Sequence, residues 1–401
     1  MRILLLHDIG TPTGGAETQM LALRDGLRAR GHTVELLSSD VRHPSGAAIA
    51  ADATCFGTDS RLQTLSRTAN PSAFLAVREA LRSFQPDVVH VRLFLWQLSP
   101  LILPLLRDTP ALYHAAMYAS TCPKGTKRLP DGRACPYPAG RACTQNGCIT
   151  PQTGLVLAAQ RALWRRWRDA LDTTVVLSER MRDVFAGDPN APPTPMEVIY
   201  NGVPTRPARP ALTSPPTAAY AGRLVPEKGV DVLLRAVAQA VETVPETQLL
   251  IAGQGPEEAA LRQLADALAI SERITWLGHL SRDDMERAFE TAWVQAVPSQ
   301  WDEPFGNVTT EAMMRGSAVV VSDGGAQPEI VGPVGRVVPR ADVDAWATAL
   351  IDVLSDRDAA ERRGAEGRAR AQTEFSEARC LDHFEALYAR LTTPEPTLVS
   401  D

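Results

Sequence analysis

Short apolar segments alternate with helix-length segments along most of the chain. Residues 2–7 (RILLLH) form an apolar run, residues 14–31 carry apolar side chains at helical spacing, and residues 33–39 (TVELLSS) return to strand character. This order predicts a β-α-β unit at the start of the chain.

The same alternation continues to about residue 340. Further strands are predicted in the first half at 86–92, 111–115, 173–178 and 196–202. A second series is predicted at 218–224, 247–255, 273–278, 293–299, 318–322 and 335–339. Because these runs are almost continuously apolar, they are typical of parallel strands that are covered on both faces. The pattern therefore predicts two doubly wound α/β domains.

A proline-rich stretch at 206–217 (RPARPALTSPPT) separates the two series and has no apolar periodicity. We expect an N-terminal domain over 1–205, a linker over 206–217 and a C-terminal domain over 218–375. Residues 376–401 are expected to hold a C-terminal helix that crosses back to the N-terminal domain, followed by a tail.

Composition narrows the class of protein. A length of 401 residues exceeds one ordinary core, and 44% hydrophobic with 22% charged residues favours a packed globular protein. The net charge of −6 gives no general attraction to nucleic acid, so no nucleic-acid partner is expected. The apolar run at 2–7 is too short for a signal peptide core or a membrane span, so cytoplasmic residence is expected.

Residues 303–316 (EPFGNVTTEAMMRG) follow directly on a predicted strand. Asn307 is expected to cap a helix that runs to Arg315, and Gly306 would let a ligand approach the helix start closely. Because the N–H groups of a helix N-terminus favour anions, this segment predicts a diphosphate site.

Two carboxylates, Glu303 and Glu311, lie eight positions apart beside this predicted anion site. Carboxylates repel a phosphate and suit neutral hydroxyl groups such as those of a sugar. The alternative is that Glu311 only complements the helix dipole and Glu303 is a solvated loop residue.

Two cations, Arg223 and Lys228, lie in the loop after the first strand of the second series (AGRLVPEKGVD, 221–231). Parallel strands end at one edge of a sheet, so this loop and the 300–306 loop are expected to lie at the same edge. The two cations are predicted to clamp a diphosphate. Ordinary solvated surface charges are the alternative.

Glu303, Phe305, Gly306 and Glu311 match the motif E-x-F-G with a second glutamate at the eighth position. With it, the sequence resembles glycosyltransferase family 4, which comprises retaining, nucleotide-sugar-dependent enzymes. The resemblance extends to further stretches and covers nearly the whole chain: Gly14–Gly15, 201–203, 222–229 and 320–331. It implies the GT-B fold, in which two Rossmann-like doubly wound parallel-sheet domains face each other across a deep cleft.

The resemblance also implies roles for individual residues. Glu311 would hold the ribose of the donor nucleotide and Glu303 a hydroxyl of the donor sugar, while Arg223 and Lys228 would bind the diphosphate. The rest of the implied donor site is Gly14, Gly15, Gly278, Phe305, Gly306 and Asn307.

His114 ends a predicted strand and is expected to point into the cleft, where the family carries a histidine near the reacting sugar carbon. It joins Glu303, Arg223 and Lys228 as a predicted catalytic residue. The alternative is a packed core histidine, and His7 and His90 fit that description better.

The implied reaction is transfer of a hexose or N-acetylhexosamine, with retention, from a nucleoside-diphosphate sugar to a hydroxyl acceptor. UDP is the expected nucleotide and GDP-mannose stays open. The acceptor would be a small molecule, a glycan or a lipid-linked sugar in polysaccharide, glycolipid or natural-product biosynthesis. No metal or other cofactor is expected in catalysis. A sugar-nucleotide epimerase or phosphorylase and a non-catalytic sugar-binding protein are the alternatives.

Four cysteines, Cys122, Cys135, Cys143 and Cys148, lie in a polar insert at 121–150 that is expected to contain neither helix nor strand. A structural zinc ion bound by four thiolates would order such a loop. The spacing lacks the paired C-x2-C of strong zinc motifs, so free thiols and disulfides remain alternatives.

Residues 163–171 (LWRRWRDAL) place Trp164 and Trp167 on one side of a predicted helix and arginines on another. Such a helix could rest on a membrane surface, which would make the protein peripheral at the inner membrane face. A core-facing amphipathic helix is the favoured interpretation, because only one short segment carries the signal.

Overall fold

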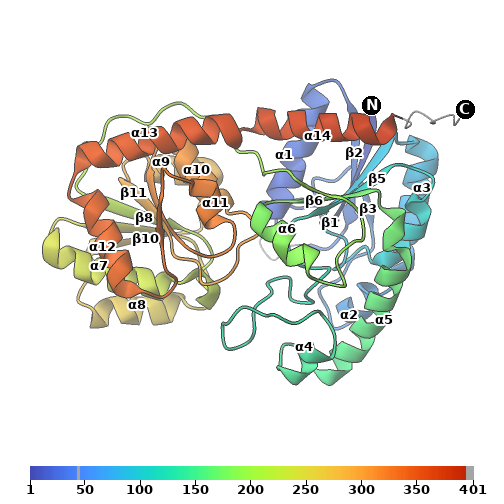
Figure 1. Cartoon of the computed structure of the whole chain (residues 1–401), viewed down its shortest axis with the longest axis horizontal. Helices are drawn as coiled ribbons and strands as arrows, with labels where there is room; N and C mark the ends of the chain where they lie inside the picture. The colour runs from blue at the N-terminus through green and yellow to red at the C-terminus, as the bar shows by residue number, and fades with distance from the viewer. Residues whose placement is uncertain (43–45, 394–401) are drawn as a thin grey trace, which may run out of the picture. The chain divides into compact units, whose positions relative to one another are not determined.

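The computed structural model describes residues 1–42 and 46–393 (Figure 1). Its strands are β1 (Arg2–Ile9), β2 (Thr33–Ser39), β3 (Ala53–Cys55), β4 (Val88–Val91), β5 (Ala111–Ala115), β6 (Thr173–Val176), β7 (Met196–Val198), β8 (Thr217–Ala221), β9 (Gln248–Ala252), β10 (Ile274–Gly278), β11 (Val294–Val297), β12 (Ala318–Ser322) and β13 (Arg336–Val338). Its α-helices are α1 (Gly15–Ala29), α2 (Gln63–Ser66), α3 (Pro71–Phe84), α4 (Arg141–Gln145), α5 (Pro151–Trp167), α6 (Glu179–Ala186), α7 (Val230–Thr243), α8 (Glu258–Ala267), α9 (Arg282–Phe289), α10 (Asn307–Arg315), α11 (Gln327–Val331), α12 (Val343–Leu354), α13 (Arg357–Glu374) and α14 (Glu377–Thr392). The 3-10 helices are η1 (Pro100–Leu106), η2 (Arg168–Ala170), η3 (Pro226–Lys228) and η4 (Ser271–Arg273).

The chain divides into two compact units. The first comprises Met1–Asp131, Cys135–Asn201 and the segment that starts at Ala378, and the second comprises Gly132–Ala134 and Gly202–Glu377.

The proline-rich segment 206–217 lies within the second unit. Leu212 is buried in that unit's core, and its backbone N–H donates to Glu361 Oε1 at 2.7 Å. Residues 394–401 of the expected C-terminal tail lie outside the described residues.

The first unit is built on a seven-stranded parallel sheet in the order β3-β2-β1-β4-β5-β6-β7. Side chains of the central strand β1 alternate between its two faces. Ile3 and Leu5 pack into the cluster that α1 covers, while Leu4 and Leu6 on the opposite face are also fully buried. Burial on both faces explains why residues 2–7 read as a continuous apolar run.

Helix α14 completes the core of the first unit although it follows the second unit in the chain. Its side chains Phe384, Leu387 and Tyr388 belong to the same buried cluster as α1 and β1. At the rim of this contact, Arg30 of the loop after α1 pairs with Asp382 at 2.7 Å.

Helix α5 contains both tryptophans of the segment 163–171. The ring of Trp164 is 2% exposed and packs against Phe94 and Tyr113, with ring centroids 5.7 and 5.9 Å away, and its Nε1–H donates to the carbonyl of Asn190 at 2.8 Å. Arg165 reaches the side-chain oxygen of the same Asn190 at 2.8 Å. The segment therefore presents Trp164 to the core, as the favoured interpretation expected. Within residues 1–42 and 46–393, no helix has the length and apolarity needed to cross a membrane.

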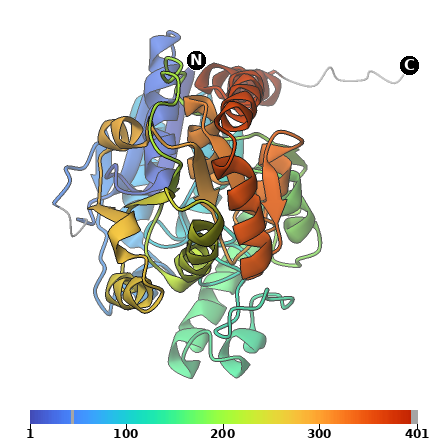
Figure 2. The same ribbon diagram turned by 90° about the vertical axis from the view of Figure 1, so that its left-hand side faces the viewer.

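The second unit is built on a six-stranded parallel sheet in the order β10-β9-β8-β11-β12-β13. Alternate residues again serve two faces: Tyr220 and Ile251 join the cluster formed with α7 and α12, while Ala219 and Ala252 join a smaller cluster around Phe289. Figure 2, in which this unit faces the viewer, shows helices on both sides of its sheet.

The predicted fold class is confirmed: both units are Rossmann-like, doubly wound parallel sheets. Each predicted strand is present, and the three-residue β3 (Ala53–Cys55) is an addition that the sequence pattern did not indicate. One expectation about the insert was wrong, because Arg141–Gln145 form the short helix α4 inside it.

Candidate functional site

Three neighbouring strands of the second unit, β8, β11 and β12, end at the same edge of the sheet. The segments that follow them contribute Lys228, Glu303 and Gln327. Lys228 Nζ lies 2.5 Å from Glu303 Oε1, and Gln327 Nε2 donates to Glu303 Oε2 at 3.2 Å. The structure thus brings together two residues that the sequence predicted, Lys228 and Glu303, and adds Gln327. The signal for Gln327 was its place at the start of α11, directly after the loop that follows the adjacent strand β12.

Glu303 is only 5% exposed, and Ser299 Oγ also donates to its Oε1, at 2.5 Å. Burial alone would raise the pKa of Glu303, but the charge of Lys228 and the hydrogen bonds from Lys228 and Ser299 outweigh burial and hold the pKa below its usual value. Glu303 is therefore ionised at neutral pH. Oε2 accepts one hydrogen bond in this network and retains capacity to accept another from a ligand hydroxyl.

Gly306, not Asn307, occupies the N-cap position of α10, which corrects the expected cap. Gly306 has φ +123°, and a Cβ there would lie 2.4 Å from Gln327 Nε2. Thr309 Oγ1 in the first turn donates to Gln327 Oε1 at 2.6 Å, so Gln327 connects the start of α10 to Glu303. Gly306 has no side chain to cap the helix, and the N–H groups of a helix start favour anions.

Phe305 anchors the loop to its own unit. The ring is 2% exposed and meets Phe375 edge to face, with centroids 5.9 Å apart. The Phe305 ring is therefore part of the packing of the second unit.

Arg223 lies in the loop after β8, and its side chain is 68% exposed. Its guanidinium is 3.4 Å from Glu227, and its carbonyl accepts a hydrogen bond from the Tyr220 hydroxyl at 2.9 Å. The backbone of this loop is fixed while the guanidinium is solvated. The structure does not bring Arg223 into the Lys228–Glu303 network.

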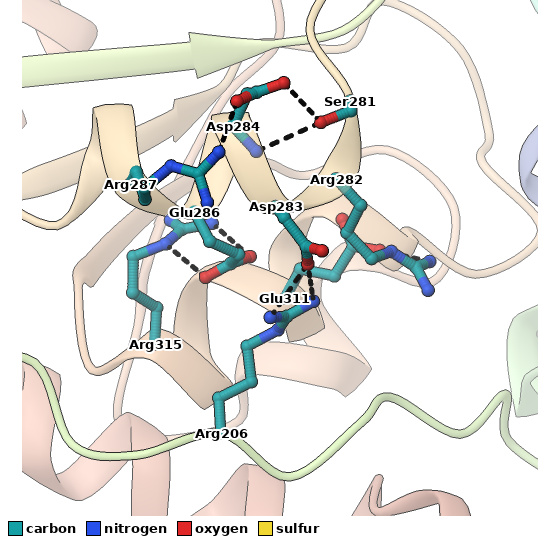
Figure 3. A network of polar contacts seen from close by, with 9 residues as sticks. All are labelled: Arg206, Ser281, Arg282, Asp283, Asp284, Glu286, Arg287, Glu311 and Arg315. Atoms are coloured by element: carbon teal, nitrogen blue, oxygen red, sulfur yellow. Dashed lines mark hydrogen bonds and ion pairs between the residues drawn. The ribbon is translucent and has the colours of Figure 1, made fainter.

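Glu311 is held by a residue that the sequence analysis did not select. Arg282, the first residue of α9, places a guanidinium nitrogen 2.9 Å from Glu311 Oε1 (Figure 3). Burial raises the pKa of Glu311; the charge of Arg282 opposes this and that of Glu286 reinforces it, and the net shift is upward. The signal for Arg282 was weak: it follows β10, whose carboxyl end lies at the same sheet edge.

A further ion pair joins α9 to α10, and another joins α9 to the segment before β8 (Figure 3). Arg315, whose side chain is 4% exposed, pairs with both oxygens of Glu286 at 2.9 Å and donates to Gln295 Oε1 at 3.0 Å. Arg206 lies 3.3 Å from Asp283. These contacts hold the two helices that carry Arg282 and Glu311.

Gly14, Gly15 and Gly278 each lie at the end of a helix or strand of their own unit. Gly14 is the N-cap of α1 with extended φ of −131°, and Gly15 begins the helix. Gly278 ends β10 in the left-handed region with φ +65°, and its carbonyl accepts from the Gly253 N–H at 2.7 Å.

His114 lies inside the first unit, which corrects the expectation that it projects from a strand end. The side chain is 1% exposed, its Nδ1 lies 3.0 Å from His90 Nε2, and its ring packs on Phe384 with centroids 5.2 Å apart. Burial and the nearby charge of Arg92 lower the pKa of both His114 and His90 well below the usual value. Strand β5 continues past His114 to Ala115, and Phe384 of α14 packs on the ring, which is why the ring is covered.

The four cysteines of the insert all line one cavity of the first unit: Cys122, Cys135, Cys143 and Cys148. Each is a free thiol. Within residues 1–42 and 46–393, no three His, Cys, Asp or Glu side chains already stand at metal-coordinating separations.

Comparison with known proteins places the chain in a family. The family model "Glycosyltransferase Family 4" matches residues 13–206, and "Glycosyl transferases group 1" matches residues 205–370. Together the two models cover residues 13–370, which leaves out β1, the last four residues of α13 and α14.

Curated relatives match part of the chain. A D-inositol 3-phosphate glycosyltransferase of Mycobacterium sp. (strain KMS) is 36% identical over 216 residues, 49% of this chain and 48% of the relative. A GDP-mannose-dependent monoacylated alpha-(1-6)-phosphatidylinositol monomannoside mannosyltransferase of Corynebacterium glutamicum is 37% identical over 168 residues, 40% of this chain and 44% of the relative. The matched stretches thus span about half the length of these curated relatives.

Among solved structures, Anabaena HepE in complex with UDP and glucose aligns with a TM-score of 0.68 and 18% identity, covering 97% of this chain and 99% of that one. This likeness extends over both units and agrees with the GT-B fold. With a family model matched to each of its two Rossmann-like units, the chain belongs to glycosyltransferase family 4.

Proposed function

We propose that this protein is a retaining glycosyltransferase that moves a hexose or N-acetylhexosamine from a nucleoside-diphosphate sugar to a hydroxyl acceptor. One observation carries the proposal: the ionised Glu303 is held by Lys228 and Gln327 beside the N-terminus of α10. A carboxylate acceptor for sugar hydroxyls and a cationic, N–H-rich site for a diphosphate are then adjacent, as a sugar diphosphate requires.

In the proposed reaction, the bond between the sugar anomeric carbon and the diphosphate oxygen breaks while the acceptor oxygen bonds to the same face of that carbon. The acceptor proton passes to the departing diphosphate. Lys228, Arg223 and the N-terminus of α10 stabilise the negative charge that develops on the diphosphate. Because this positive charge comes from the protein, the proposed reaction requires no metal ion.

Glu311 is proposed to accept hydrogen bonds from the ribose of the donor. It lies on α10 eight residues after Glu303, and its Oε1 is engaged by Arg282. Donor binding at this carboxylate therefore requires the ribose hydroxyls to share it with Arg282 or to displace the guanidinium.

The proposed donor is a UDP-sugar, and the HepE complex with UDP and glucose supports this choice. The corynebacterial relative is named as GDP-mannose-dependent, which supports GDP-mannose as the alternative donor. The proposed acceptor class is a small molecule, a glycan or a lipid-linked sugar, and the relative named D-inositol 3-phosphate glycosyltransferase supports the small-molecule choice.

Calorimetric titration of UDP, GDP, ADP and TDP into the wild-type protein and Glu311→Ala tests the donor site. We expect one diphosphate to bind best, and its affinity to fall about tenfold in Glu311→Ala through the loss of charged hydrogen bonds to the ribose. Failure of all four diphosphates to bind would contradict the proposal.

Incubation with UDP-glucose, UDP-N-acetylglucosamine and GDP-mannose, with and without a panel of hydroxyl acceptors, then tests the reaction. A transferase releases nucleoside diphosphate rapidly only when an acceptor is present, and NMR of the product gives its anomeric configuration. Acceptor-independent conversion of the nucleotide sugar would instead identify an epimerase.

A further inference from the structure

The insert at 121–150 contains little regular secondary structure and few buried side chains. It connects β5 to α5 (Figure 1), and α4 is its only helix. The residues that it buries are all small: Thr121, Cys122, Gly125, Ala139 and Cys143. Large apolar side chains, which ordinarily offset the conformational entropy of ordering a loop of this length, are missing from its interior.

Four cysteines of the insert surround one cavity in its interior. Cys122, Cys135, Cys143 and Cys148 come from separate parts of the insert, yet all four line the same cavity. Cys122 and Cys143 are buried, and the other two are half-buried. A random scatter of cysteines over thirty positions would not gather every one of them around one space.

Backbone hydrogen bonds fix the turns on which these cysteines lie. The N–H of Gly125 donates to the carbonyl of Cys122 at 2.9 Å, and the N–H of Cys148 donates to the carbonyl of Cys143 at 2.9 Å. The N–H of Cys135 donates to the carbonyl of Lys127 at 2.7 Å. Three backbone hydrogen bonds thus fix the segments that place the four cysteines around one cavity.

Lys127 fastens this framework to the unit. Its Nζ lies 2.9 Å from Asp188, whose side chain is 3% exposed, and donates to the carbonyl of Tyr137 at 3.0 Å. Removal of one partner from a buried ion pair leaves the other charge uncompensated, so this contact constrains the position of Lys127. The walls of the cavity are therefore tied to residues outside the insert.

We propose that Cys122, Cys135, Cys143 and Cys148 bind one structural Zn²⁺ as thiolates. Four sulfur ligands around one centre suit tetrahedral zinc, and the positive ion offsets the mutual repulsion of four thiolates in one cavity. The thiols do not stand at coordinating separations in this structure, so zinc binding requires the four side chains to close onto the ion. This site is independent of the proposed transferase activity.

Metal analysis of the wild-type protein, purified without chelator from zinc-supplemented cells, is the first test. We expect about one equivalent of zinc per chain. Single Cys→Ser variants at the four positions should each lose most of it, whereas Cys55→Ser and Cys380→Ser, which alter the two cysteines outside the insert, should keep it. Cobalt substitution of the wild-type protein should give the visible absorption of a tetrahedral thiolate site.

Less than about a tenth of an equivalent of zinc in the wild-type protein would overturn the proposal, whether its thiols are all titratable or are paired in disulfides. The outcome does not depend on whether the serine variants fold. Limited proteolysis of the wild-type protein gives a second measurement: a chelator should make the insert the first site of cleavage, and an unchanged cleavage pattern would count against zinc.

Discussion

The ammonium of Lys228 and the carboxylate of Glu303 lie 2.5 Å apart, with side-chain exposures of 18% and 6%. The two residues follow different strands, so their pairing depends on the sheet order that places β8 beside β11. Removal of one partner from such a pair leaves the other charge poorly compensated.

Lys228→Met should therefore lower the free energy of unfolding by about 3 kcal/mol and weaken nucleoside diphosphate binding. Chemical denaturation and calorimetry measure the two effects. The double variant Lys228→Met/Glu303→Gln removes the unpaired charge and should recover much of the stability without recovering the binding. If binding returned along with stability, Lys228 would have only a structural role.

Arg282→Ala should free Glu311 for a ligand. The pair is partly exposed, so its loss should tighten binding of the preferred nucleoside diphosphate about two- to fivefold at pH 8. The gain should shrink as the pH is lowered, because without Arg282 the already raised pKa of Glu311 rises further and the carboxylate becomes protonated.

Arg287→Ala is the matched control, since Arg287 lies on the same helix and pairs with Asp284 instead of Glu311 (Figure 3). Its affinity for the nucleotide should equal that of the wild type. Weaker binding by Arg282→Ala would mean that Arg282 itself contacts the donor.

Gly306→Ala should lower kcat with a moderate loss of stability. A Cβ at Gly306 meets Gln327 Nε2, the group that hydrogen-bonds Glu303. Gly316→Ala provides the comparison, because Gly316 also has positive φ (+92°) but the nearest atom to its Cβ is 3.8 Å away. Both variants should be destabilised by about 1 kcal/mol through backbone strain, and only Gly306→Ala should lose activity. Equal activities of the two variants would mean that the position of Gln327 does not affect the reaction.

Acid should destabilise the first unit through its buried histidines. Burial lowers the pKa of His7 to about 3 and lowers those of His90 and His114, so the folded unit keeps these rings neutral while the unfolded chain protonates them below about pH 6.5. Each histidine therefore lowers the free energy of unfolding by about 1.4 kcal/mol per pH unit as the pH falls below that value.

Asp8 acts in the opposite direction. Burial raises its pKa to about 6, so the folded state takes up a proton there between about pH 6 and 4 and offsets one histidine. Urea unfolding monitored by hydrogen exchange of β4 and β5 between pH 5 and 8 gives the slope of the free energy of unfolding against pH. His90→Gln should reduce that slope; an unchanged slope would show that the rings titrate in the folded state.

Apolar runs predicted the sheets because parallel strands covered on both faces leave few polar positions, as in 2–7 and 318–322. The same property hid the orientation of His114: when both faces of β5 are buried, position in the strand does not reveal whether a side chain meets a ligand or the core. Lys228 and Glu303 could be placed at one sheet edge from strand order alone. Their direct contact, and the parts taken by Gln327 and Arg282, depend on loop conformations that neither periodicity nor spacing encodes.

The place of α14 has a consequence for biosynthesis. Phe384, Leu387 and Tyr388 complete the hydrophobic core of the first unit, yet they are translated after the whole second unit. While the ribosome is still producing residues 202–377, the nascent first unit exposes the apolar surface of α1 and β1 that α14 later covers. All residues of the second unit are made by Glu377, whereas the core of the first unit is completed only when α14 has left the exit tunnel.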